Sequence, residues 1–250
     1  MELKKMRPGR GFAIGLSAGL ERALSKLGYC SRRQAMLLIA AGRVSVNNVV
    51  RKDPQFRVDP RADTITVDDQ TVRAAAKIYL MLNKPRGLVV TASDEQGRAT
   101  VFECLKGSEL PFVAPIGRLD KASEGLLLFT NDTQWAARIT DPLTHLDKTY
   151  HVQIDCLADP ALIERLKQGV KSGGDFLTAK QARLLRQGTR NSWLEIVLDE
   201  GKNRHIRRLL ESLNARVLRL VRIAIGPLQI GNLAKGEFRY LTDPERCELG

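Results

Sequence analysis

The sequence predicts an α+β protein built from two units, a small helix–helix–hairpin unit and a larger, mixed and mostly antiparallel sheet. Two observations predict this division. Near the N-terminus, two short stretches of helical periodicity come before short alternating stretches. After residue 77, predicted strands outnumber helices and are not strictly interleaved with them. We therefore place a flexible basic leader at 1–15, the small unit at 16–72, a linker at 73–77 and the larger unit at 78–250.

The small unit begins with two helices. Leu20, Leu24 and Leu27 have helical spacing, and a glycine follows them. Ser31 and Gln34 have the spacing of a capping box, which predicts the start of the second helix. Short strands are then predicted at 44–46, 49–50 and 64–67, with a tight turn at 47–48.

The larger unit contains longer elements. Four apolar or alternating stretches predict strands at 78–82, 150–154, 193–198 and 217–225. A short helix is predicted at 134–139, and Asp159-Pro160 has the pattern of an N-cap followed by proline in the first turn of another.

The charge of the chain favours polyanionic partners. Lys and Arg number 40 against 28 Asp and Glu, which gives a net charge of +12. Seven cations and one acid between 201 and 222 carry half of this excess. Such clustering suits a surface that follows phosphates. Aromatic residues make up only 5%, so a base-stacking platform of aromatic side chains is not expected.

The cysteines and the N-terminal segment indicate a cytoplasmic protein. The four cysteines are far apart and form no C-x-x-C pair, so neither a zinc site nor a disulfide framework is expected. The short Gly-containing apolar stretch at 11–16 runs into a charged helical pattern, which favours a leader over a signal peptide. No apolar run has transmembrane length, and we expect no membrane association.

One loop has the features of a catalytic site. Gly117-Arg118-Leu119-Asp120 lies shortly before the apolar run 126–129, which we expect to be a buried strand. A carboxylate on a glycine-containing loop beside a buried strand is held rigidly in a cleft. The alternative is that Asp120 only caps a neighbouring helix.

A helix is predicted after 203, and one of its arginines lies at the edge of its apolar face. At 100° per residue, Ile206, Leu209 and Leu210 share one face, and Arg207 lies at its edge. An arginine there can reach a cleft, pair with Asp120 and stabilise its charged form. The alternative is a surface ion pair with Glu211.

Residues 24–50 resemble the alpha-L, or ribosomal protein S-four-like, RNA-binding domain. The resemblance rests on Ser-Arg-Arg before an apolar helical stripe and on Gly-Arg-Val-Ser-Val-Asn after it. It implies that five residues lie near an RNA backbone: Ser31, Arg32, Arg33, Gln34 and Arg43. The alternative is a solvated charged face on a pair of amphipathic helices.

The larger unit resembles the ribosomal RNA pseudouridine synthases from about 78 to 242. The resemblance rests on four ordered motifs, Lys84-Pro85-x-Gly87, 117–132, Lys148-Thr149-Tyr150 and 201–208, and on a closing pattern at 225–236. It implies isomerisation of uridine to pseudouridine, a redox-neutral reaction that needs no cofactor or metal.

The resemblance also assigns roles. Asp120 is implied to be the nucleophile, Arg207 its ion-pair partner, and Tyr150 the residue that stacks on the target base. Taken alone, a tyrosine at this position is more often a core residue with its hydroxyl satisfied. Arg118 is implied to help hold the target uridine out of its helix, because an enzyme acting on a base must extract it from its stack. The further expected contacts with substrate or RNA are made by Ile206, Arg204, Arg208, Lys84 and Lys148.

Two hypotheses follow. The first is a site-specific uridine isomerase acting on ribosomal RNA or a pre-ribosomal particle, with large-subunit RNA favoured by the stretch 94–102, and working as a monomer without an obligate protein partner. The second is a non-catalytic RNA-binding factor of ribosome assembly. A DNA-binding protein is a weaker third, because nothing in the sequence has the features of a major-groove recognition helix.

Overall fold

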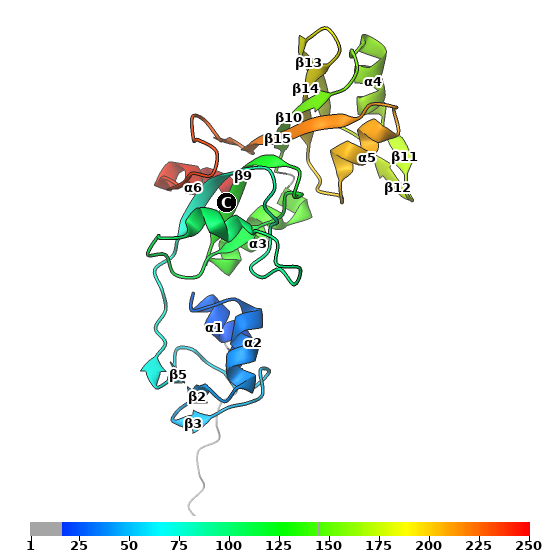
Figure 1. The fold of residues 1–250 in the computed structure, drawn as a ribbon. Coiled ribbons are helices and arrows are strands. Elements are labelled where there is room, and N and C mark those ends of the chain that lie inside the picture. The colour runs from blue at the N-terminus through cyan, green and yellow to red at the C-terminus, as the bar shows by residue number, and fades with distance from the viewer. Residues whose placement is uncertain (1–16, 145) are drawn as a thin grey trace, which may run out of the picture. The chain divides into compact units, whose positions relative to one another are not determined.

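The computed structural model describes residues 17–144 and 146–250, and the chain divides after Ala75 into two compact units (Figure 1). The predicted leader at 1–15 lies outside the described residues. Within the described residues, no helix is long and apolar enough to cross a membrane. The same residues contain no group of three or more His, Cys, Asp and Glu side chains placed to hold a metal ion.

The first unit contains the predicted helix pair and hairpin. Its helices are α1 (Leu20–Lys26) and α2 (Arg32–Ala40). Its main sheet has the order β3-β2-β5-β6. The strands are β2 (Val44–Val46), β3 (Val49–Val50), β5 (Ile65–Val67) and β6 (Gln70–Thr71), with a separate pair β1 (Ala18–Gly19) and β4 (Arg57–Val58). The turn between β2 and β3 has left-handed backbone at Asn47 and Asn48, as a tight hairpin requires.

The second unit is built on one large sheet with the order β13-β14-β10-β15-β9-β7-β17, to which β8 and β16 add at β9 and β15. Its strands are β7 (Tyr79–Lys84), β8 (Ala114–Ile116), β9 (Glu124–Thr130), β10 (Lys148–Ile154), β13 (Gln181–Gln187), β14 (Ser192–Leu198), β15 (Val217–Ile225), β16 (Leu228–Gln229) and β17 (Phe238–Tyr240). A hairpin of β11 (Val170–Ser172) and β12 (Asp175–Leu177) lies apart from it. The prediction of a mostly antiparallel α+β sheet is confirmed, with β9 and β15 paired in parallel.

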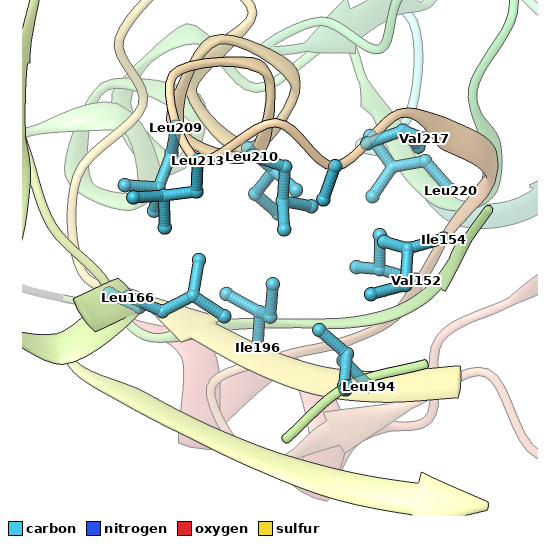
Figure 2. Close-up of a cluster of buried hydrophobic side chains, with 14 of the residues drawn as sticks. Val152, Ile154, Leu166, Leu194, Ile196, Leu209, Leu210, Leu213, Val217 and Leu220 are labelled. Atoms are coloured by element: carbon cyan, nitrogen blue, oxygen red, sulfur yellow. The ribbon is translucent and has the colours of Figure 1, made fainter. Parts of the chain in front are cut away.

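Two groups of helices cover different parts of this sheet. The helices of the second unit are α3 (Thr133–Thr140), α4 (Pro160–Gln168), α5 (His205–Glu211), α6 (Asp243–Leu249) and the short 3₁₀ turns η1 (Val101–Leu105) and η2 (Pro142–Thr144). Figure 1 shows α4 and α5 at the end formed by β13, β14 and β10, and α6 at the opposite end. In Figure 2 the leucines of α5 face Ile196 and Leu194 of β14 across a closed apolar core. This core fixes α5, and therefore Arg207, relative to the sheet.

Strand β9 lies inside the sheet, between β15 and β7. All seven of its residues are buried. Gly125 has a positive φ, and a Cβ at this position would lie 2.2 Å from the backbone oxygen of Arg222 on β15. Only glycine permits so close an approach of the two strands. The loop that precedes β9 is thereby attached to a rigid element.

Candidate active site

A cleft of about 940 Å³ opens in the second unit. The loop before β9, the start of β10 and the segment that leads into α5 line it. These three segments carry the motifs at 117–132, Lys148-Thr149-Tyr150 and 201–208. The fold therefore brings together residues that are up to 90 positions apart in the chain.

Asp120 lies on a tightly bonded loop at the edge of this cleft. Gly117, just after β8, has a φ of 68°, so the chain turns there. The backbone N–H of Ser123 donates to the carbonyl of Asp120 at 2.9 Å, and that of Gly87 donates to the carbonyl of Lys121 at 2.8 Å. The Asp120 side chain is 36% exposed. Its backbone is fixed while its carboxylate remains accessible from the cleft.

Lys84 holds this loop from the inside. Its side chain is fully buried, and Nζ donates to the carbonyls of Ser123 at 2.8 Å, Pro85 at 3.1 Å and Asp120 at 3.3 Å. Burial lowers the pKa of Lys84 to about 8, although the charges of Cys104, Glu124 and Asp120 oppose that shift. The expectation that Lys84 contacts RNA is wrong, because the ammonium group is enclosed and bonded to three carbonyls.

Arg207 reaches the carboxylate of Asp120. Its Nε lies 3.8 Å from Oδ2, and Nη2 donates to the carbonyl of Ala122 at 3.3 Å. The guanidinium is 11% exposed. Burial lowers the pKa of Arg207, and the charge of Asp120 opposes that change. The pair is within ion-pair distance but Nε forms no hydrogen bond, a looseness that is common in catalytic pairs without bound substrate.

Tyr150 faces the same cleft from β10. A bulge in the pairing of β10 with β15 lies between Thr149 and Tyr150, and it sets Tyr150 opposite Arg222. Such bulges re-aim side chains next to sites. The ring is half-buried, and within the described part of the chain its hydroxyl forms no hydrogen bond.

The other residues predicted around the base and phosphates divide into two groups. Ile206 is buried against the cleft, and Arg118, Lys148 and Arg204 line it. Arg204 has left-handed backbone, with a φ of 49°, directly before α5. Arg208 is not in the cleft: Nη1 donates to Asp175 at 2.8 Å and Nη2 to the carbonyl of Ser172, which ties α5 to the β11–β12 hairpin. The expected phosphate contact of Arg208 is therefore replaced by a structural one.

Unmet hydrogen-bonding capacity is concentrated in this cleft. Among the described residues, seven buried side-chain nitrogen or oxygen atoms have no partner, and five of them belong to cleft residues. These five atoms are Ser123 Oγ, His205 Nδ1 and Nε2, Arg207 Nε and Arg222 Nη2. Burial lowers the pKa of His205, so its imidazole is neutral at pH 7. Buried polar atoms without partners are rare in native proteins, and their concentration in one place indicates a site for a polar ligand.

In the first unit, the predicted RNA contacts are partly used by the fold itself. The hydroxyl of Ser31 accepts from the N–H of Gln34 at 3.2 Å, and Oε1 of Gln34 accepts from the N–H of Ser31 at 3.0 Å. Ser31 is buried, so its expected RNA contact is wrong, while the predicted capping box is confirmed. Arg43 donates through Nε to Asp68 at 2.8 Å. Arg32 and Arg33 remain exposed.

Arg222 was not predicted as a site residue, although the sequence contains a signal for it. In β15 the buried positions include Leu220, Arg222 and Ala224. A charged residue in the buried register of a predicted strand needs a partner or a ligand. That pattern could have drawn attention to it.

Comparisons with known proteins match both units. The family model of RNA pseudouridylate synthases matches residues 78–212, and that of the S4 domain matches residues 19–75. An RNA pseudouridine synthase of Aquifex aeolicus is 37% identical over 92% of both chains. The ribosomal large subunit pseudouridine synthase B of Bacillus subtilis is 32% identical over 90% of this chain and 93% of its own. A crystal structure of a pseudouridylate synthase is 28% identical, with a TM-score of 0.64 over 94% of this chain and all of its own. The chain therefore belongs to the RNA pseudouridine synthase family.

Proposed function

We propose that the protein converts a specific uridine of ribosomal RNA to pseudouridine, with Asp120 as the nucleophile and large-subunit RNA as the favoured substrate. The observation that carries this proposal is the placement of Asp120 on a fixed loop beside Arg207, at the edge of a cleft that Tyr150 also lines. The similarity to a large-subunit enzyme of Bacillus subtilis supports the choice of RNA.

The chemistry requires an ionised carboxylate beside the ribose. In the reaction the bond between N1 of uracil and C1′ breaks, the ring turns, and a bond between C5 and C1′ forms; C5 loses a proton and N1 gains one. Asp120 supplies the carboxylate that attacks the sugar or removes a proton from it. Arg207 orients this carboxylate through their ion pair and its own hydrogen bond to the carbonyl of Ala122.

The remaining cleft residues position the nucleotide. Tyr150 stacks on the target base, and Ile206 packs beneath it. Arg118 holds the uridine out of its helix, Arg204 contacts a flanking phosphate, and Lys148 contacts the nucleotide from the start of β10. Arg32 and Arg33 of the S4 domain contact the RNA backbone.

A non-catalytic assembly factor is the second candidate. It needs the S4 domain and the basic surface but has no physical use for a carboxylate, an arginine and a tyrosine around one cleft. The two roles are compatible in one protein.

The deciding experiment is a chemical map of pseudouridine across both ribosomal RNAs in cells that lack the protein. We expect one site to be lost and to return with the wild-type gene but not with Asp120→Ala. A map that is unchanged by the deletion contradicts the proposed substrate. Restoration of the lost site by Asp120→Ala contradicts the assignment of the nucleophile.

A further inference from the structure

Arg222 occupies the point where the strand of the tyrosine and the strand of the nucleophile loop meet. It is a register partner of Tyr150 on β10 and of Gly125 on β9. Residues paired across a strand project from the same face of a sheet, so Arg222 and Tyr150 are neighbours on the cleft side. The arginine is only 6% exposed.

The guanidinium of Arg222 is held in place by one hydrogen bond, but another of its nitrogens has no partner. Its Nε donates to the carbonyl of Leu126 on β9 at 2.7 Å. Nη2 is buried and has no partner, and no ion pair joins Arg222 to an acid within the described residues. A buried charge that has no carboxylate partner and one unpaired donor is unfavourable for the fold. An arginine that served the fold alone would be paired, as Arg219 on the same strand is with Glu124.

A second cation reinforces this positive charge. Lys148, at the start of β10, also lines the cleft. It lies two residues before Tyr150 on β10, and therefore on the same face of the sheet as Tyr150 and Arg222. Burial and the charge of Arg222 both lower the pKa of Lys148. A second cation beside the unpaired donor of Arg222 favours an electron-rich oxygen of a ligand.

The backbone of Arg222 cannot move away. The close approach at Gly125 holds the two strands together, and the Leu126 carbonyl orients the side chain. The donor is therefore in place before substrate binds, which is the condition under which such groups stabilise developing charge most strongly.

We propose that Arg222 donates a hydrogen bond to a carbonyl oxygen of the uracil ring, recognising the base and stabilising the negative charge that it carries once detached. This rests on the proposed function. When the N1–C1′ bond breaks, its electron pair remains on uracil and spreads to O2 and O4. Arginine has only donors, so it suits O2 or O4 of uracil; at O4 it also discriminates against cytosine, whose amino group at that position cannot accept its hydrogen bond. A phosphate is disfavoured, because Arg222 is deep beside Tyr150 whereas Arg118 and Arg204 are exposed at the rim.

The first test combines a variant of Arg222 with substitutions of single atoms of the substrate. Arg222→Met keeps the apolar stem and removes all donors; Arg216→Met, at an exposed arginine just before the same strand, is the matched control. Under single-turnover conditions we expect a loss of about 100-fold for Arg222→Met, with RNA affinity changed less than about threefold.

The decisive measurement is whether the effect of the Arg222 variant depends on the atom that is substituted in the substrate. Substitution of sulfur for O2 or O4 of the target uridine should slow the wild type at one of these positions, and that penalty should disappear in Arg222→Met. An equal penalty in both proteins overturns the proposal. The same comparison is made with a methylphosphonate at a linkage next to the target uridine. If the effect of Arg222→Met depends on this substitution and not on the sulfur substitution, Arg222 contacts a phosphate, and the proposal is overturned.

A second measurement does not depend on turnover or on the folding of a variant. The Nε–H resonance of Arg222 in the wild-type protein is followed by NMR during titration with uridine 5′-monophosphate, cytidine 5′-monophosphate and inorganic phosphate. We expect a shift with the uridine nucleotide and none with inorganic phosphate; a shift with the cytidine nucleotide as well places the contact at O2, which both bases carry. An equal response to phosphate, or none to the uridine nucleotide, contradicts the assignment. If the wild type modifies no ribosomal RNA, the proposed function fails while this titration still decides the ligand of Arg222.

Discussion

Two carboxylates four residues apart, Asp120 and Glu124, have opposite surroundings. Glu124 is buried and bonded to Arg219 at 2.7 and 3.0 Å and to Lys235 at 2.7 Å. Asp120 is partly exposed, and Arg207 approaches it only to 3.8 Å. The tight cluster stabilises the junction of loop and strand, whereas the loose pair leaves a charged oxygen available to substrate. Satisfied polar groups characterise the frame of this site, and unsatisfied ones characterise its cleft.

The largest effect is expected at the loose carboxylate. Asp120→Asn should lower the rate of pseudouridine formation by at least about 1,000-fold, because the amide cannot act as a nucleophile. RNA affinity and unfolding free energy should change little, since the ion pair of Asp120 with Arg207 is loose, at 3.8 Å. Quantified pseudouridine on the target RNA and urea titration measure the two quantities. Substantial activity of the variant would remove Asp120 from the mechanism.

Arg207→Lys tests whether the loose pair needs the planar guanidinium. A lysine cannot contact both Asp120 and the carbonyl of Ala122 with the same geometry. We expect a loss of about 100-fold in single-turnover rate with RNA binding retained. Arg208→Lys on the same helix is the control, and it should affect stability and not rate. A similar rate loss in both variants would indicate a general disturbance of α5.

Glu124→Gln tests the tight cluster. Arg219 and Lys235 hold the pKa of Glu124 at about 2, against an ordinary value of 4.5, although burial opposes them. The group therefore stabilises the fold fully above about pH 4.5, and this contribution is lost as the pH falls toward 2. At pH 7 we expect the variant to be less stable by about 3 kcal/mol. Denaturant titrations of both proteins at several pH values should converge on acidification; a constant difference contradicts the assignment.

Lys84→Met tests the buried contacts that hold the Asp120 loop in place. Loss of three carbonyl contacts should loosen Asp120 and reduce the rate by about tenfold, with RNA affinity unchanged because the ammonium group is buried. The lowered pKa of about 8 gives a pH signature. Between about pH 8 and 10.5 the unfolded chain binds the extra proton, so wild-type stability rises with pH there and that of the variant does not. A weakened RNA affinity of the variant would instead support the original expectation that Lys84 contacts RNA.

The smallest effect is expected in the S4 domain. Ser31→Ala removes the cap of α2 and should cost about 1 kcal/mol of stability while RNA affinity is unchanged. Arg32→Ala should do the reverse, weakening RNA binding and reducing its dependence on salt by about one charge. Fluorescence anisotropy at several salt concentrations, with thermal melts, separates the two. Equal RNA affinities in wild type and Arg32→Ala would exclude a phosphate contact there.

Local sequence determined the elements of the fold and the motif residues of the cleft. The capping box at Ser31, the turn at Asn47–Asn48 and the Asp159-Pro160 helix start are interactions between near neighbours, which the sequence displays directly. Strand β13 was not predicted, although it is seven residues long, because its side chains are mostly exposed and show no apolar alternation. The short strands β4 and β6 were also not predicted. The pairing of Asp120 with Arg207 was predicted because a helical wheel and a family motif agreed.

Tertiary structure decided which polar side chains are free to bind. By sequence, Lys84, Arg208 and Ser31 were expected to contact RNA. Long-range packing has given Lys84 carbonyl partners and Arg208 an aspartate, whereas Ser31 caps its own helix. Arg222 is the opposite case: it was not expected at the site. The structure places it there through its pairing with β9 and β10, whose paired residues are up to 97 positions away in the chain. A sequence specifies donors and acceptors, but which of them remain unpaired depends on all the neighbours that folding brings together.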